Sequence, residues 1–175
     1  QYAGGLICLS GCLHGEIPNL LLSNQAEKAE EIAQEYQNIF GKDNFFIEIQ
    51  PHFEKNDKKN ISSAIIGLSK KLEISLIATN DIHYISKEDD NCHDALLAIG
   101  TGNKVSDPNR LSLKGVNLSF ESSEGMAEFF SDIPEAMSNT QKIVDVVDFN
   151  FEFGNLQFPH FELPKDETAE SYLEK

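Results

Sequence analysis

Along the first hundred residues, short apolar runs alternate with segments in which apolar residues recur at helical spacing. This order is typical of strands followed by helices. Short apolar runs bounded by turn residues predict buried strands, and apolar residues spaced three and four apart predict helices between them. The expected strands are 5–9, 44–50 and 75–80, and the expected helices are 24–40, 60–72 and 89–99. Regular alternation with short connections indicates parallel strands joined by right-handed crossovers. We therefore predict an α/β fold, either half of a barrel or a small open sheet.

The pattern changes after Gly102. Residues 103–120 are rich in turn residues and lead to a short extended piece that begins at Val116. Ser122 or Ser123 is expected to begin a short helix. For the next helix we expect a cap at Asp132, Pro134 in the first turn and an end at Val147. We expect residues 149–164, rich in Phe and Pro, to be irregular and docked on another surface, and a last helix to begin at Thr168.

Helix 24–40 and the helix after it also carry predicted boundaries. Ser23 or Asn24 can cap the start of the first, and Gly41 can supply its left-handed end. Asn60 is the predicted start of the second.

The most informative candidate for chemistry is Asp81-Ile82-His83, directly after the strand 75–80. The carboxyl ends of parallel strands are where α/β folds carry their ligands. In extended chain, Asp81 and His83 point to the same side, about 6.5–7 Å apart between alpha carbons. A carboxylate and an imidazole there can bind one metal ion, or two adjacent ones. The alternative is that Asp81 caps a turn and His83 packs on the surface.

A second candidate lies in the loop after the first strand. Cys12 follows that strand as Asp81 follows its own, so both are expected at the same rim of the sheet. A cysteine thiolate is a good ligand for zinc. The alternative is that Cys12 is a small buried apolar residue, and His14 beside it is expected to be exposed.

Four further residues are weaker candidates. Glu48 and His52 flank the end of the middle strand and can contact a metal or a substrate. His93 falls within helix 89–99 beside apolar residues, which favours a core or capping role, and His160 is expected to be structural. The sequence lacks a phosphate-binding glycine loop, a nucleophile turn, a C-x-x-C pair and the carboxylate cluster of a polymerase.

Composition narrows the possible functions. The chain is 40% hydrophobic and 25% charged, which is enough for a folded core, and its formal net charge is −15. That charge argues against binding a nucleic-acid backbone alone, but not as part of a larger protein. No apolar run is long enough for a membrane span and no signal peptide is visible. Three cysteines without a pairing pattern indicate a reducing, cytoplasmic setting, and Gln1 predicts a piece of a longer protein.

Five strings of the sequence together resemble the alpha subunits of bacterial replicative DNA polymerase III. They are SGCLHGEI (10–17), FGKDNFFIEIQ (40–50), LIATNDIHYISKEDDNCHDALLAIGTG (76–102), DPNRL (107–111) and FFSDIPEAMSNTQKI (129–143). The resemblance implies that residues 1–148 are the C-terminal part of a PHP (polymerase and histidinol phosphatase) domain and that 149–175 connect to the palm. The fold that it implies is part of a distorted (β/α)7 barrel.

The resemblance also implies chemistry. The parent protein would be a DNA-directed DNA polymerase, a nucleotidyltransferase, and its PHP domain would bind zinc, manganese or magnesium and carry a proofreading 3′–5′ exonuclease. Cys12, Asp81 and His83 match metal ligands of such domains, with Asp81 and His83 as the catalytic pair. An earlier H-x-H motif and the remaining ligands would lie before Gln1, so we expect this chain alone to be inactive.

Two other functions stay open. The PHP domain can instead be a scaffold that steadies the polymerase or binds a separate proofreading subunit. If the resemblance is set aside, a third hypothesis is that the chain is a small stand-alone metal-dependent phosphoesterase. The expected partners are DNA through the full-length polymerase only and other replicase subunits, with no membrane and with possible self-association of this chain.

Overall fold

The three expected strands form one parallel sheet in the computed structural model, which describes residues 2–51, 61–156, 158–159 and 161–174. Within these residues the sheet order is β1-β2-β3, and Cys8 lies opposite Phe45 while Ile47 lies opposite Leu76. The strand bounds are β1 Cys8–Leu9, β2 Phe45–Ile49 and β3 Leu76–Ala78. The predicted α/β class and the parallel order are confirmed, but the described residues form an open sheet and do not close a barrel.

Helices connect the strands of this sheet and follow the last of them in the chain. In the described residues they are α1 Glu16–Leu22, α2 Ala26–Phe40, α3 Ile61–Leu72, α4 Asp90–Gly100, α5 Ser123–Phe129, α6 Pro134–Val146 and α7 Ala169–Leu173. All except α1 were predicted from the sequence. Asn60, the predicted first residue of α3, lies outside the described residues.

Two predicted helix starts were wrong by one or two residues. Gln25, and not Ser23 or Asn24, precedes α2, and it makes no side-chain capping bond. The residue before α6 is Ile133, because Pro134 occupies the first helical position; Asp132 lies one residue too early. The predicted cap of α5 is confirmed, since the Ser122 hydroxyl accepts a hydrogen bond from the Gly125 amide at 3.0 Å.

The core lies between one face of the sheet and the helices. Phe45, Ile47 and Ile49 alternate along β2 toward this face and are almost completely buried. The other residues of the buried cluster come from β3, from helices α1, α2, α3 and α6, and from the residues that directly follow α3 and α5. They are Ile17, Ala29, Ala33, Ile61, Ile65, Leu68, Ile74, Leu76, Ala78, Phe130 and Ala136. Burial of this face fixes the sheet, and with it the loops at its carboxyl edge.

The two edges of the sheet differ. At the β3 edge, the Asn139 side chain of α6 donates to the Leu76 carbonyl at 2.6 Å, and Thr140 donates to the Ala78 carbonyl at 3.5 Å. α6 therefore covers backbone groups that a further strand would use. In the described residues β1 pairs only with β2, and Leu9 on β1 remains 37% exposed.

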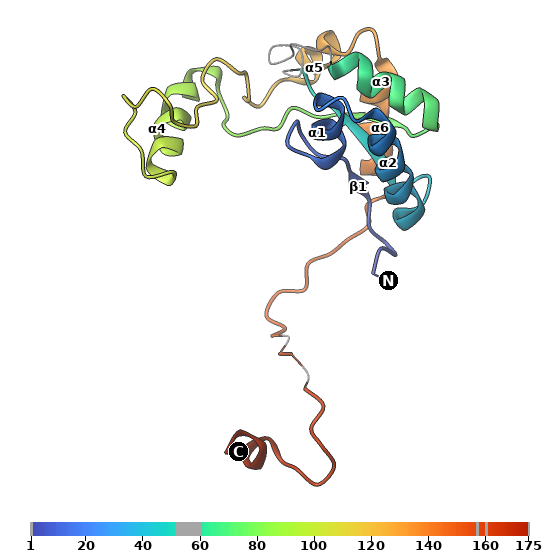
Figure 1. Ribbon diagram of the computed structural model, residues 1–175, viewed down its shortest axis with the longest axis vertical. Coiled ribbons are helices and arrows are strands. Elements are labelled where there is room, and N and C mark those ends of the chain that lie inside the picture. Colours follow the sequence, from blue (N-terminus) through green and yellow to red (C-terminus); the bar gives the residue numbers. More distant parts are fainter. Residues whose placement is uncertain (1, 52–60, 157, 160, 175) are drawn as a thin grey trace.

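Helix α4 and the C-terminal segment lie away from the sheet (Figure 1). α4 stands to one side, and the chain after α6 extends away from the body toward α7. The described large apolar side chains of 149–164 are mostly exposed and not docked on the sheet and its helices; Phe153, for example, is 91% exposed. The extended piece expected from Val116 appears only as a single bridge between Tyr84 and Ser119.

Candidate metal-binding site

Asp81 and His83 meet at the carboxyl end of β3. Asp81 Oδ1 lies 3.5 Å from His83 Nε2, and both side chains are partly exposed. The backbone reaches this contact differently from the expected extended chain, because Asp81 adopts a left-handed conformation with φ of 49°. Asp tolerates this conformation better than most residues. An oxygen donor and a nitrogen donor are thus held side by side at the carboxyl end of the strands, where the sequence predicted them.

His93 completes a row of three side chains. His83 Nδ1 lies 3.0 Å from His93 Nε2, and the two rings meet edge to face with centroids 4.9 Å apart. The Tyr84 ring packs beside His93 at 5.4 Å. The sequence suggested a core or capping role for His93, which lies in the first turn of α4. The helical pattern gives its position on α4 but does not show that α4 returns to His83.

Backbone hydrogen bonds fix the segment that carries His83. The His83 amide donates to the Leu118 carbonyl at 2.9 Å, and the Phe120 amide donates to the Tyr84 carbonyl at 3.0 Å. A capping box between Ser86 and Asp89 then turns the chain into α4. The position of His83 is therefore set by residues 118–120 as well as by β3.

Asp94 and Arg110 hold α4 against the loop that follows it. Arg110 Nη1 donates to Asp94 Oδ1 at 2.7 Å, Nη2 donates to Oδ2 at 2.5 Å, and the Ser112 hydroxyl donates to Oδ1 at 2.6 Å. The Arg110 guanidinium, followed by the Ser112 hydroxyl, holds the pKa of Asp94 well below its usual range. Asp94 is 3% exposed, so this cluster fixes the orientation of the residue next to His93.

Cys12 lies in the loop that leaves β1. Because β1 and β3 are parallel members of one sheet, this loop leaves the same edge as Asp81. Cys12 is half-buried, its carbonyl accepts the Gly15 amide at 2.8 Å, and His14 is exposed as expected. A Cβ at Gly15 would lie 2.4 Å from the Ser10 carbonyl oxygen, so the tight turn requires glycine there.

Glu48 belongs to a buried polar cluster that joins the strand ends. Its Oε1 accepts hydrogen bonds from the Thr79 hydroxyl and, at 2.5 Å, from Gln50 Nε2. Its amide donates to the Ser10 hydroxyl at 2.9 Å. Gln50 Oε1 is buried without a hydrogen-bond partner among the described residues. Glu48 thus cross-links the sheet, while the other weak candidates His52 and His160 lie outside the described residues.

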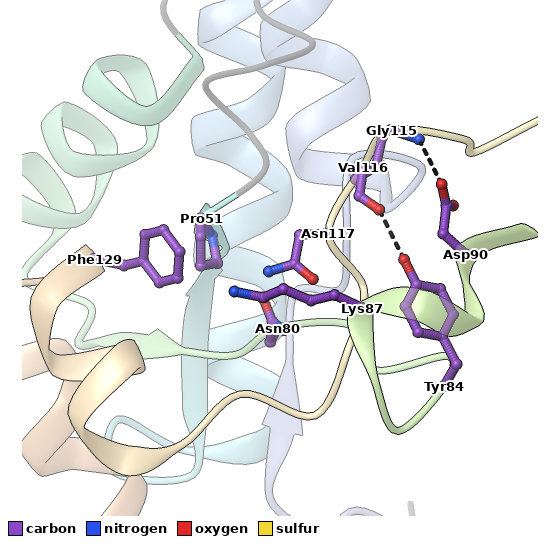
Figure 2. Close-up of a pocket in the computed structure, with 9 residues that line it drawn as sticks. All are labelled: Pro51, Asn80, Tyr84, Lys87, Asp90, Gly115, Val116, Asn117 and Phe129. Carbon is purple, nitrogen blue, oxygen red and sulfur yellow. Dashed lines mark hydrogen bonds between the residues drawn. The ribbon is translucent and has the colours of Figure 1, made fainter.

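A cavity of about 370 Å³ lies beside the Asp81–His83 segment (Figure 2). In Figure 2, Lys87 extends toward Asn80 and Asn117 at its centre, with Phe129 at one end. Lys87 Nζ also lies 2.9 Å from Glu121 Oε1. The hydrogen bond from Lys87 and, to a smaller extent, the one from Asn117 lower the pKa of Glu121. The Lys87 charge is therefore balanced within this chain.

The donors present fit a divalent metal only in part. Carboxylate, imidazole and thiolate are the ligand types that zinc accepts. In the ranges that the structure describes, however, no group of three or more His, Cys, Asp or Glu side chains is close enough to hold one ion. Asp81 and His83 supply two adjacent donors, and Cys12 does not join them in one cluster. A complete site would need further donors.

The chain matches two kinds of known sequence. Residues 1–52 match the PHP domain model. The chain is 40% identical over 172 residues to the DNA polymerase III subunit alpha of Treponema pallidum, covering 98% of this chain. The same protein of Borreliella burgdorferi is 38% identical over 99% of the chain, and that of Thermus aquaticus 35% over 99%.

These relatives are much longer than this chain. It spans 15% of the length of the first two and 14% of the Thermus aquaticus protein. The part of the chain that the structure describes contains no helix that is both long and apolar enough to cross a membrane.

Proposed function

We propose that this chain, which belongs to the family of the DNA polymerase III alpha subunits, supplies metal ligands to the PHP domain of a replicative DNA polymerase. The observation that carries the proposal is the contact between Asp81 and His83 at the carboxyl end of β3. Similarity along nearly the whole chain to subunits of that name supports it. Cys12, at the same edge of the sheet, is proposed as a third ligand.

Each of these residues has a specific role in the proposal. Asp81 presents a carboxylate oxygen and His83 presents Nε2 on the side that faces Asp81. Zinc, manganese or magnesium bound there, together with donors from outside this segment, would supply an activated water for cleavage of a phosphodiester bond. The reaction proposed for the intact protein is removal of nucleotides from a DNA 3′ end. The 175-residue chain by itself is expected to be inactive.

DNA would reach this site through the longer polypeptide. The chain has 29 acidic and 14 basic residues, so its own surface repels a phosphate backbone. Other replicase subunits are the further partners proposed. The three cysteines are free, which suits the reducing cytoplasm in which we propose that the protein acts.

A scaffold function is the second candidate. It is favoured by the absence of a three-ligand group among the described residues. In that case the PHP domain would steady the polymerase or bind a separate proofreading subunit, and Asp81 and His83 would only stabilise the loop after β3.

The substitution Asp81→Asn in the full-length protein separates the two candidates. It keeps the shape of the side chain and removes its charge, so we expect bound metal and 3′–5′ exonuclease rate to fall about tenfold or more while primer extension persists. Asp43→Asn, an exposed change of the same kind, is the control. A wild-type protein without bound metal and without nuclease activity would instead support the scaffold.

A further inference from the structure

We propose that His93 is a positioning residue that orients the His83 imidazole toward the metal. The inference rests on the proposed function of Asp81 and His83. It is carried by the contact between His83 Nδ1 and His93 Nε2, at 3.0 Å. The sequence pattern gave His93 only a core or capping role.

The two ring nitrogens of His83 have different partners. Nε2 faces Asp81 Oδ1 at 3.5 Å, and Nδ1 faces His93. A neutral imidazole has one nitrogen that donates and one that accepts. When Nδ1 of His83 carries the proton, its N–H can donate a hydrogen bond to His93 Nε2. The lone pair of His83 Nε2 is then free on the Asp81 side. The other tautomer would place a proton where the metal must bind.

This arrangement follows a general property of metal-binding histidines. The ring nitrogen that does not bind the metal usually donates to a fixed acceptor, which sets the tautomer and the ring orientation. His93 Nε2 lies at the required distance and is such an acceptor when the proton of the His93 ring is on Nδ1. It thereby selects Nε2 of His83 as the ligand atom and holds it next to the Asp81 carboxylate.

His93 is itself held from both sides. The Tyr84 ring packs against it at 5.4 Å, and the His83 ring meets it edge to face. The next residue, Asp94, is buried and paired with Arg110 through both of its carboxylate oxygens, which fixes the rotation of the N-terminal half of α4. An acceptor fixed in this way can orient a ligand more strongly than a mobile side chain or a water molecule could.

Two substitutions separate hydrogen bonding from packing. His93→Phe keeps an aromatic ring against His83 and Tyr84 but removes the acceptor. His93→Gln removes the ring but places an amide oxygen that can accept from Nδ1. A positioning role predicts that Phe impairs and Gln preserves metal binding, whereas a purely structural role predicts the reverse order.

The experiment measures zinc and manganese affinity of the full-length protein by competition with a chelator. We expect His93→Phe to weaken affinity about 10–100-fold, the usual effect of losing such a partner, and His93→Gln to stay within about threefold of wild type. Cys92→Ser changes an exposed neighbour on α4 and should leave affinity unchanged. Wild-type affinity in His93→Phe, or an equal loss in both His93 variants, would overturn the inference.

Asp81→Asn makes failure of the inference distinguishable from failure of the proposed function. If wild type binds metal, Asp81→Asn loses it and His93→Phe retains it, only the role of His93 is wrong. If wild type binds neither metal, both proposals are wrong.

Discussion

Asp94 joins the N-terminal half of α4 to the loop at Arg110 through both of its carboxylate oxygens. Its pKa is lowered by the hydrogen bonds from Arg110 and Ser112. A carboxylate whose pKa is lowered by folding adds stability above its unfolded pKa, near 3.9, and loses that contribution as the pH falls toward its folded pKa. This region should therefore be stabilised at neutral pH and weakened in acid.

We expect Asp94→Asn to lower the thermal unfolding midpoint at pH 7, because Arg110 is then left without its charged partner. The difference from wild type should shrink as the pH falls below about 5, because the unfolded wild-type chain then takes up a proton at Asp94 while the folded protein, in which the pKa of Asp94 is lowered, does not. Thermal scans across that pH range measure it, with Asp43→Asn as the exposed control. A difference that stays constant with pH would show that the charge of Asp94 is not what stabilises the region.

At the same scale, the sequence predicted some contacts of the site and missed others. The position of Asp81-Ile82-His83 directly after the apolar strand β3 placed Asp81 and His83 at one rim, although the left-handed backbone of Asp81 could not be anticipated. His93 was missed because its contact with His83 depends on a turn closed by Ser86 and Asp89. Helical periodicity describes which residues share a face, and it carries no information on where that face packs.

The longer helices were predicted from their periodic pattern, and the short helices α5 and α7 mainly from the capping residues at their starts. α2 and α3 span three turns or more, and their apolar stripes identified them. α1 was missed because its seven residues follow Gly15 and contain Pro18, both of which usually mark a loop. Pro18 is tolerated because it lies in the first turn, where the helix needs no donor from it.

Helix α6 makes a specific contribution to the sheet through Asn139. This side chain is buried and donates to the Leu76 carbonyl, which lies on the side of β3 that faces away from β2. Asn139→Ala would leave that carbonyl buried without a partner, so we expect the free energy of unfolding to fall by about 1–3 kcal/mol. Urea unfolding measures this change.

Ser138→Ala is the matched control for Asn139→Ala. Ser138 is the exposed neighbour on α6, and its hydroxyl donates only within the helix, to the Glu135 carbonyl. It should cost less than about 0.5 kcal/mol. An equal effect of both changes would mean that α6 covers the edge by packing alone.

Among the described residues of the whole molecule, the sheet has one edge that is covered and one that is not paired. α6 covers the edge of β3, while β1 pairs only with β2, and Leu6 and Leu9 at β1 line a groove of about 600 Å³ together with Val146 and Phe149 among others. Periodicity could predict the parallel order of the strands but not whether the sheet closes, because closure depends on the number and tilt of strands in the whole barrel.

We expect the 175-residue chain to self-associate through the β1 edge. An unpaired edge strand beside apolar side chains is a template for pairing with another copy. The net charge of −15 opposes association, but salt screens it beyond about 8–10 Å and does not screen the buried contact. Sedimentation velocity over a range of concentrations measures the association.

Leu9→Lys tests which surface is involved. Covering a leucine side chain contributes about 1.5–3 kcal/mol, so replacing it by a charged lysine should weaken association about tenfold or more. Leu96→Lys makes the same change at an exposed position on α4, away from β1 (Figure 1), and should leave association unchanged. A wild-type chain that stays monomeric at about 100 μM, or equal effects of the two lysines, would contradict an interface at the β1 edge.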